Sequence, residues 1–269
     1  MNNLKKYTFE YGLVFLAIFL SITGFWNIFF GVRASPTLYH HLHIITISIW
    51  LGLLLYQLNA IRKEHYATHR KIGLFILFMG PLLVASTALL SVHSAHKGIV
   101  SGQGDFLIVQ NVMGTFELGL VILLAFILKK KRKWHGAFLL STALLFIGIA
   151  LFFTLISFIP QYKIEGPETF YRFETAGVTG SYACLFIGFI FFLKDRRNGW
   201  PLLLAGSFFT LNGFLNLFLI KNKYIQPLTE FVGSLNQVAT FTGSFVVLLV
   251  LLVLTGLVNK RNVTFAKSY

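Results

Sequence analysis

The chain has 269 residues, of which 56% are hydrophobic and only 12% are charged. No stretch is long and polar enough to fold as a separate soluble domain, so residues 1–269 are expected to form one transmembrane domain. A net charge of +14 would suggest nucleic-acid binding in a soluble protein. Here the basic residues lie in short connections between apolar segments, where anionic lipid headgroups attract them, and nucleic acid is not an expected partner.

Eight apolar segments follow one another along the chain, and each has about the 20 residues that a helix needs to cross the hydrocarbon core. The sequence therefore predicts an all-α fold, a polytopic bundle of eight transmembrane helices whose main partner is the lipid bilayer. The segments cover residues 11–30, 41–60, 72–92, 106–128, 136–159, 173–193, 200–220 and 237–258.

Basic residues are sorted between alternate connections. All but six of the 23 Lys and Arg residues lie at the two termini or in the second, fourth and sixth connections. Because positive charge is retained on the cytoplasmic side during insertion, both termini are predicted to be cytoplasmic. The six exceptions are Arg33, Lys97, Lys163, Arg172, Lys221 and Lys223.

The second segment carries a polar stripe. His43, Trp50 and Gln57 repeat every seven residues, a spacing that keeps them on one face of a helix. A polar stripe on an apolar span is expected to face the bundle interior, toward water or a ligand. Hydrogen bonds between helices would explain the same pattern equally well.

The fourth segment contains an acid near its middle. Glu117 is about 11 residues from either end of the segment, and Gln110 and Gly114 lie on the same helical face. An isolated carboxylate is strongly disfavoured in hydrocarbon, so the group should be protonated or paired. Proton handling or ligand contact and a purely structural role are both compatible with this position.

Eight histidines are divided between the two membrane faces by the predicted topology. His40, His41, His43, His93 and His96 fall on the outer face, and His65, His69 and His135 fall on the cytoplasmic face. The i, i+3 pair His93 and His96 can face one ion. Together with His43 it forms a candidate site for Cu or Zn.

Several of these residues form a familiar order. Gly24-Phe25-Trp26 is followed by His41-x-His43, Trp50, Gln57 and His69-Arg70-x-x-Gly73. This order resembles a family of uncharacterised bacterial inner-membrane proteins with the pattern G-F-W … H-x-H … W … Q … H-R-x-x-G, followed by a later span that opens with His. The resemblance implies a multi-pass protein of the cell inner (cytoplasmic) membrane and candidate residues, but no reaction.

The two-sided placement of histidines is also similar to cytochrome b561-type diheme electron carriers. That similarity implies haem b as a cofactor, with His43 and His93 as ligands on the outer face and His69 and His135 on the inner face.

Three functions therefore stay open. The chain is either a haem- or metal-binding redox component, a carrier of a small solute or protons built around Glu117, or a non-catalytic sensor, assembly factor or scaffold. A lipid-modifying enzyme is a further, less favoured class. A small-molecule ligand or a membrane-protein partner would suit these alternatives, and the sequence leaves the oligomeric state open.

Overall fold

A computed structural model describes residues 7–32 and 34–265, with side chains up to residue 255. The described residues form helices and connections and contain no strand. The helices are α1 Thr8–Gly24, α2 Trp26–Phe30, α3 Leu38–Arg62, α4 Tyr66–Ser101, α5 Ile108–Ile127, α6 Arg132–Phe158, α7 Tyr171–Lys194, α8 Trp200–Lys221, α9 Ile225–Gly233 and α10 Gln237–Phe265, with a 3₁₀ turn at Pro167–Thr169 before α7.

Seven of the described helices are long and apolar enough to cross a membrane: α3 to α8 and α10. The protein is therefore a polytopic membrane helix bundle, as the composition predicts. The remaining predicted span, residues 11–30, corresponds to α1, an apolar helix of 17 residues, and to the short α2 that follows it after Phe25.

The helices are longer than the hydropathy segments at several ends. The largest difference is in α4, which runs from Tyr66 through Pro81 to Ser101, whereas the predicted segment covers 72–92. Hydropathy detects only the part of a helix that lies in hydrocarbon, while the helix continues until the backbone stops it. In α4 the stop is Gly102, whose φ of 68° is left-handed, a conformation that glycine adopts without strain.

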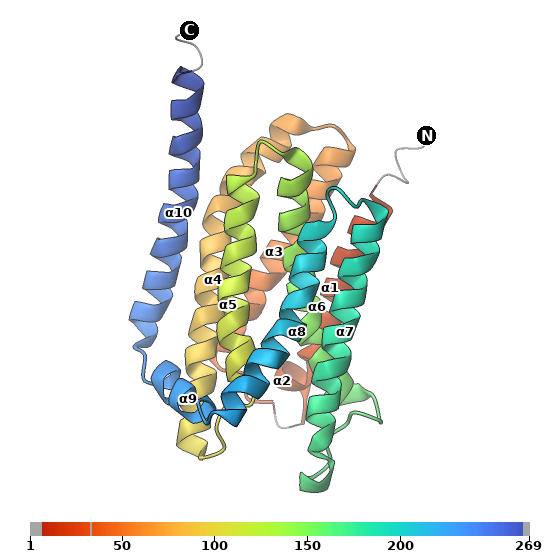
Figure 1. Cartoon of the computed structure of the whole chain (residues 1–269), viewed down its shortest axis with the longest axis vertical. Helices are drawn as coiled ribbons and strands as arrows, with labels where there is room; N and C mark the ends of the chain where they lie inside the picture. The colour runs from red at the N-terminus through yellow and green to blue at the C-terminus, as the bar shows by residue number, and fades with distance from the viewer. Residues whose placement is uncertain (1–6, 33, 266–269) are drawn as a thin grey trace.

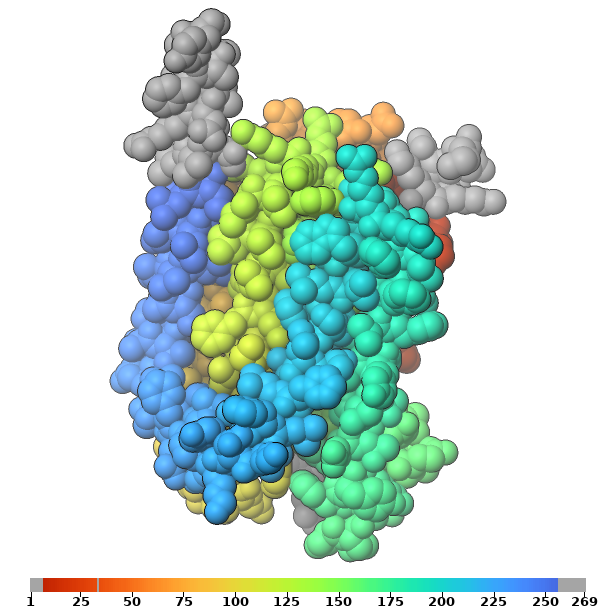
Figure 2. All heavy atoms as spheres, viewed as in Figure 1, coloured from red at the N-terminus to blue at the C-terminus, as the bar shows by residue number. Residues whose placement is uncertain are grey.

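The centre of the bundle is α6. It packs against α1, α5, α7 and α8, and 72% of its most apolar 18-residue stretch is buried. The corresponding share is 11% for α10, which packs mainly on α4. In Figures 1 and 2, α10 lies along one side of the bundle, with α5 at the surface between α10 and α8.

The connections separate into two ends (Figure 1). The α3–α4, α5–α6 and α7–α8 connections lie at the same end as the start of α1 and carry most of the described basic residues, and we call this the basic end. The α4–α5 and α6–α7 connections and α9 lie at the other end, which we call the distal end.

The α7–α8 pair is held at very short range. A Cβ atom added to Gly206 of α8 would overlap the carbonyl oxygen of Cys184, and one added to Gly188 of α7 would overlap that of Leu202. Small residues at such contacts let two helix backbones approach each other, which is a main source of helix association in membranes.

We expect Gly206→Ala to destabilise the protein. Neither α7 nor α8 can move away from the other without disturbing its own contacts with α6. Overpacking of this kind costs about 1–3 kcal/mol. The matched control is Gly213→Ala in the same helix, where an added Cβ meets nothing within 4 Å. Thermal unfolding in detergent should show a lower midpoint for Gly206→Ala only. Equal midpoints for both variants would contradict the close α7–α8 contact.

Candidate functional site

A cavity of about 240 Å³ lies in the distal half of the bundle. Residues from α3, α4 and α5 form one wall, and residues from α1–α2, α6 and α8 form the other. The first wall is rich in imidazole, hydroxyl and amide groups, whereas the second is aromatic and aliphatic. The cavity therefore has one polar and one apolar wall, and the side chains of the polar wall come from consecutive helices.

His43 anchors the polar wall to the core. Its Nδ1 lies 3.3 Å from the hydroxyl oxygen of Ser86, which is in turn 2.8 Å from that of Thr46. Ser86 and Thr46 are buried, and each hydroxyl also donates to a backbone oxygen of its own helix, Thr46 to that of His43 and Ser86 to that of Leu83. This network ties α3 to α4 and fixes the imidazole at the cavity wall.

Glu117 lies at the inner part of the cavity. Its side chain is only 5% exposed, and Oε2 has no hydrogen-bond partner among the described residues. The amide of Asn212 in α8 interacts with Glu117 and also donates to Gln110 Oε1 at 3.2 Å. An unpartnered buried carboxyl oxygen costs free energy unless a ligand, a water or a proton satisfies it.

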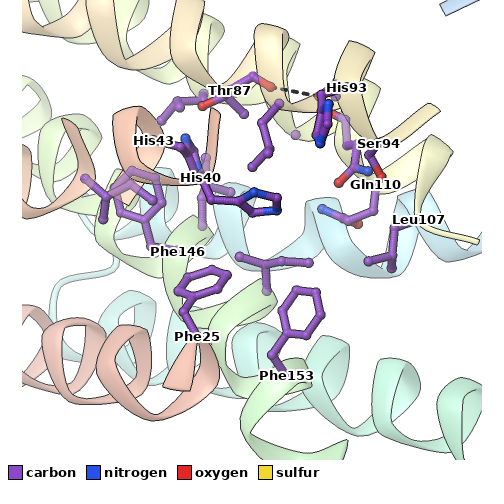
Figure 3. Close-up of a pocket in the computed structure, with 18 of the residues that line it drawn as sticks. Phe25, His40, His43, Thr87, His93, Ser94, Leu107, Gln110, Phe146 and Phe153 are labelled. Atoms are coloured by element: carbon purple, nitrogen blue, oxygen red, sulfur yellow. Dashed lines mark hydrogen bonds between the residues drawn. The ribbon is translucent and has the colours of Figure 1, made fainter. Parts of the chain in front are cut away.

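The opposite wall carries rings rather than polar groups. Phe25, Phe146, Phe153 and Phe209 all line the cavity, and the Phe25 and Phe153 rings pack against each other with centroids 5.7 Å apart. Figure 3 shows Phe25 and Phe153 on the side of the cavity that faces His93 and Gln110.

The distal histidines do not all meet. His40, His43 and His93 line the cavity, whereas His96 does not, and its backbone instead packs against Gly233 of α9. The rings of His93 and His40 have their centroids 5.8 Å apart in an edge-to-face arrangement. His41 points elsewhere, toward Phe29.

Trp50 closes the interior beyond the cavity. Its ring is fully buried beside Gly80, and its Nε1 donates to the hydroxyl of Thr142 in α6 at 2.8 Å. Trp50 does not line the cavity, although it lies on the same helix as His43 and seven residues further along. Trp50 lies between His43 and Gln57 along α3, and we call its contact with Thr142, between the cavity and the basic end, the Trp50 layer.

A second polar group occupies the basic end. Gln57 is 5% exposed, and its Nε2 donates to the backbone oxygen of His69 at 3.2 Å. Gln57 Oε1 and His69 Nδ1 are buried atoms without a partner among the described residues. His135 lies near enough to His69 for their charges to interact, and its Nδ1 bonds the Ala125 oxygen at 2.8 Å. Both members of the predicted inner pair thus lie at the basic end.

Two basic residues of the cavity are not among the ligands that the sequence predicts. His40 and Lys97 both line it. A signal was present, because His40 precedes His43 by three residues and Lys97 follows His93 by four, and both spacings keep side chains on one helix face.

In the part of the chain that the structure describes, no three His, Cys, Asp or Glu side chains form a group that could hold a metal ion. Comparisons with protein-family models, curated proteins and solved structures found no match to this chain.

Proposed function

We propose that the protein is a membrane carrier that takes up a small solute in the distal cavity. Glu117 is the ionisable group, which binds a proton when the solute binds and releases the proton when the solute leaves. The observation that carries this proposal is the position of Glu117. It combines burial near the middle of a span, an unpartnered carboxyl oxygen and direct access to a cavity.

The chemistry of the cavity supports this role. In a low-dielectric interior the charged form of a carboxyl group is costly unless it gains a partner. A protonated Glu117 avoids that cost and can donate a hydrogen bond to a bound solute, whereas loss of the proton would favour release of the solute. Binding and protonation at Glu117 are therefore coupled by the same desolvation cost.

The rest of the path runs toward the basic end. Beyond the cavity lie the buried Trp50–Thr142 contact and then the polar group of Gln57, His69 and His135. In a carrier, the Trp50 layer is the barrier that must move when the solute passes from one side to the other. The unpartnered atoms of Gln57 and His69 then offer polar contacts on the far side of that barrier.

The proposal includes eight spans in the cytoplasmic membrane with both termini in the cytoplasm. Residues Thr8 to Phe30, taken as one span, would extend about 34 Å at 1.5 Å per residue, which is enough for a hydrocarbon core of about 30 Å. The basic end then faces the cytoplasm, in agreement with the retention of positive charge there.

Reporter fusions test this orientation. We expect fusions after Lys131 and Arg196 to report cytoplasmic ends, and fusions after Gln103 and Gly166 to report external ends, since these positions lie in connections at opposite ends of the bundle. A cytoplasmic signal at Gly166 would contradict the topology.

The role of Glu117 is tested by a hydrophobic carbodiimide, which modifies protonated carboxyl groups that it reaches from an apolar phase. Mass spectrometry of the purified protein should find the label on Glu117, and Glu117→Gln should remove it. The control is Glu174→Gln, because Glu174 is exposed in the first turn of α7 and lies outside the cavity. Equal labelling of wild type and Glu117→Gln would count against an accessible, protonated Glu117.

A haem-binding redox protein is a second candidate, and one observation favours it. A carbonyl oxygen can only accept a hydrogen bond, so His135 Nδ1 must carry the proton that it shares with Ala125. Its Nε2 is then the free, neutral nitrogen, as in most metal-ligating histidines. His69, the predicted partner ligand, lies nearby.

Optical spectroscopy decides this second candidate. Haem bound between His69 and His135 would give a Soret band in protein purified in mild detergent, and His135→Ala would abolish that band. His65→Ala is the control at the same end, since His65 is exposed at the start of α4. Wild-type protein without a Soret band, from cells supplied with haem precursor, would exclude the candidate.

A further inference from the structure

The distal rim of the cavity gathers three basic groups. His40, His93 and Lys97 all line it, and the Lys97 charge is close enough to act on both imidazole rings. Such groups repel one another whenever they are charged. When all three are charged, their clustering on one rim is therefore unfavourable unless something negative compensates it.

The two imidazoles are held in place by other contacts. His40 Nδ1 is 2.8 Å from the Thr37 hydroxyl and accepts from the Thr37 backbone N–H at 3.2 Å. The His93 ring packs against Tyr39 in a tilted arrangement, with centroids 4.4 Å apart, and the Tyr39 hydroxyl donates to Gln237 of α10. The rim is consequently pre-organised and does not depend on a ligand for its shape.

No acidic side chain in the described part of the chain compensates this rim. Glu117 is the only acidic residue among the described residues that line the cavity, and it belongs to the inner part. Asp105, just before α5, does not line the cavity and already accepts from Leu107 N and Asn111 Nδ2. Lys97 takes part in none of the ion pairs formed by the described residues.

The space beside the rim is apolar on its other side. The rings of Phe25 and Phe153 face it, together with Phe146 (Figure 3). At about 240 Å³ the cavity has the volume of roughly eight liquid water molecules, which is below the range of drug-sized ligand pockets. Its occupant is therefore a small molecule with an apolar body.

We propose that the cavity binds a small organic anion, a carboxylate with an apolar body. Lys97, His40 and His93 hold the negative group at the rim, and the body lies against the phenylalanine wall. Charge-assisted hydrogen bonds from Lys or imidazole to a carboxylate are about twice as strong as neutral ones. This inference rests on the proposed carrier function and adds the class of solute.

A series of probes with one body and different head groups tests this inference. The probes are 3-phenylpropionate, 3-phenylpropionamide and 3-phenylpropylamine, with propionate as the probe that lacks the ring. Binding is measured by calorimetry and thermal shift on the full chain in nanodiscs. We expect 3-phenylpropionate to bind most tightly, the amide more weakly and the amine most weakly, with propionate weaker than its phenyl analogue.

Substitutions at the rim supply the matched comparison. Lys97→Gln should weaken 3-phenylpropionate binding roughly tenfold and leave amide binding unchanged, since one charge-assisted contact is lost. Lys97→Arg should retain most of the affinity. Lys221→Gln is the control, because Lys221 is exposed in the last turn of α8 at the same end and does not line the cavity.

The outcomes separate this inference from the carrier proposal. Tighter binding of the amine or the amide than of the carboxylate overturns the anion site, and so does an unchanged carboxylate affinity in Lys97→Gln. If the amine binds and Glu117→Gln abolishes that binding, the carrier proposal stands without the anion site. If the carboxylate depends on Lys97 but not on Glu117, the anion site stands and the role of Glu117 falls. Failure of all four probes to bind overturns the anion site.

Discussion

Hydrocarbon offers no hydrogen-bond partner, and every polar group on a membrane helix must find one inside the protein. The interior of this bundle meets that constraint in two different ways. Along α3, Thr46 and Trp50 are satisfied by side chains of α4 and α6. Glu117 and Gln57, by contrast, each keep one buried oxygen without a partner among the described residues.

Seven buried side-chain atoms among the described residues lack a hydrogen-bond partner, and those of Glu117 and Gln57 lie on opposite sides of the Trp50 layer. Glu117 belongs to the distal cavity, and Gln57 lies beside His69 toward the basic end. A buried unsatisfied acceptor costs about 1–3 kcal/mol, so such atoms are kept where a ligand, a water or a proton completes them. Glu10 also has a buried Oε2 without a hydrogen-bond partner among the described residues, but its Oε1 is paired with Lys194 at 2.7 Å, near the basic end. Glu117 has no ion-pair partner among the described residues.

The sequence predicted the framework because hydropathy and helical periodicity are local properties. Seven of the eight apolar segments coincide with helices long enough to cross a membrane, the first segment falls on α1 and the short α2, and Trp50, Gln57 and Glu117 are buried. The same local signals are silent about α9, whose nine residues are too few for a hydropathy segment. They also cannot give the distal extension of α4, because residues 93–101 continue the helix beyond the apolar stretch.

The composition of the cavity was less predictable for a different reason. Its phenylalanine wall is assembled from α1–α2, α6 and α8, and no periodicity connects Phe25 with Phe153 or Phe209. Which histidines meet is likewise a tertiary property. The i, i+3 spacing favoured His93 with His96, whereas the bend of the chain into α3 brings His40 beside His93. The predicted role of these histidines in haem or metal binding stays a prediction.

The central claim is that the distal cavity opens a path from solvent to the level of Glu117, and cysteine accessibility tests it most directly. Gly114 and Gly119 both lie on α5, but only Gly114 lines the cavity. In a Cys184→Ser background, which removes the natural thiol, each is replaced by cysteine and exposed in intact cells to a membrane-impermeant thiol reagent. The account predicts rapid modification of Gly114→Cys and little modification of Gly119→Cys. Equal modification of both, or none at Gly114→Cys, would contradict it.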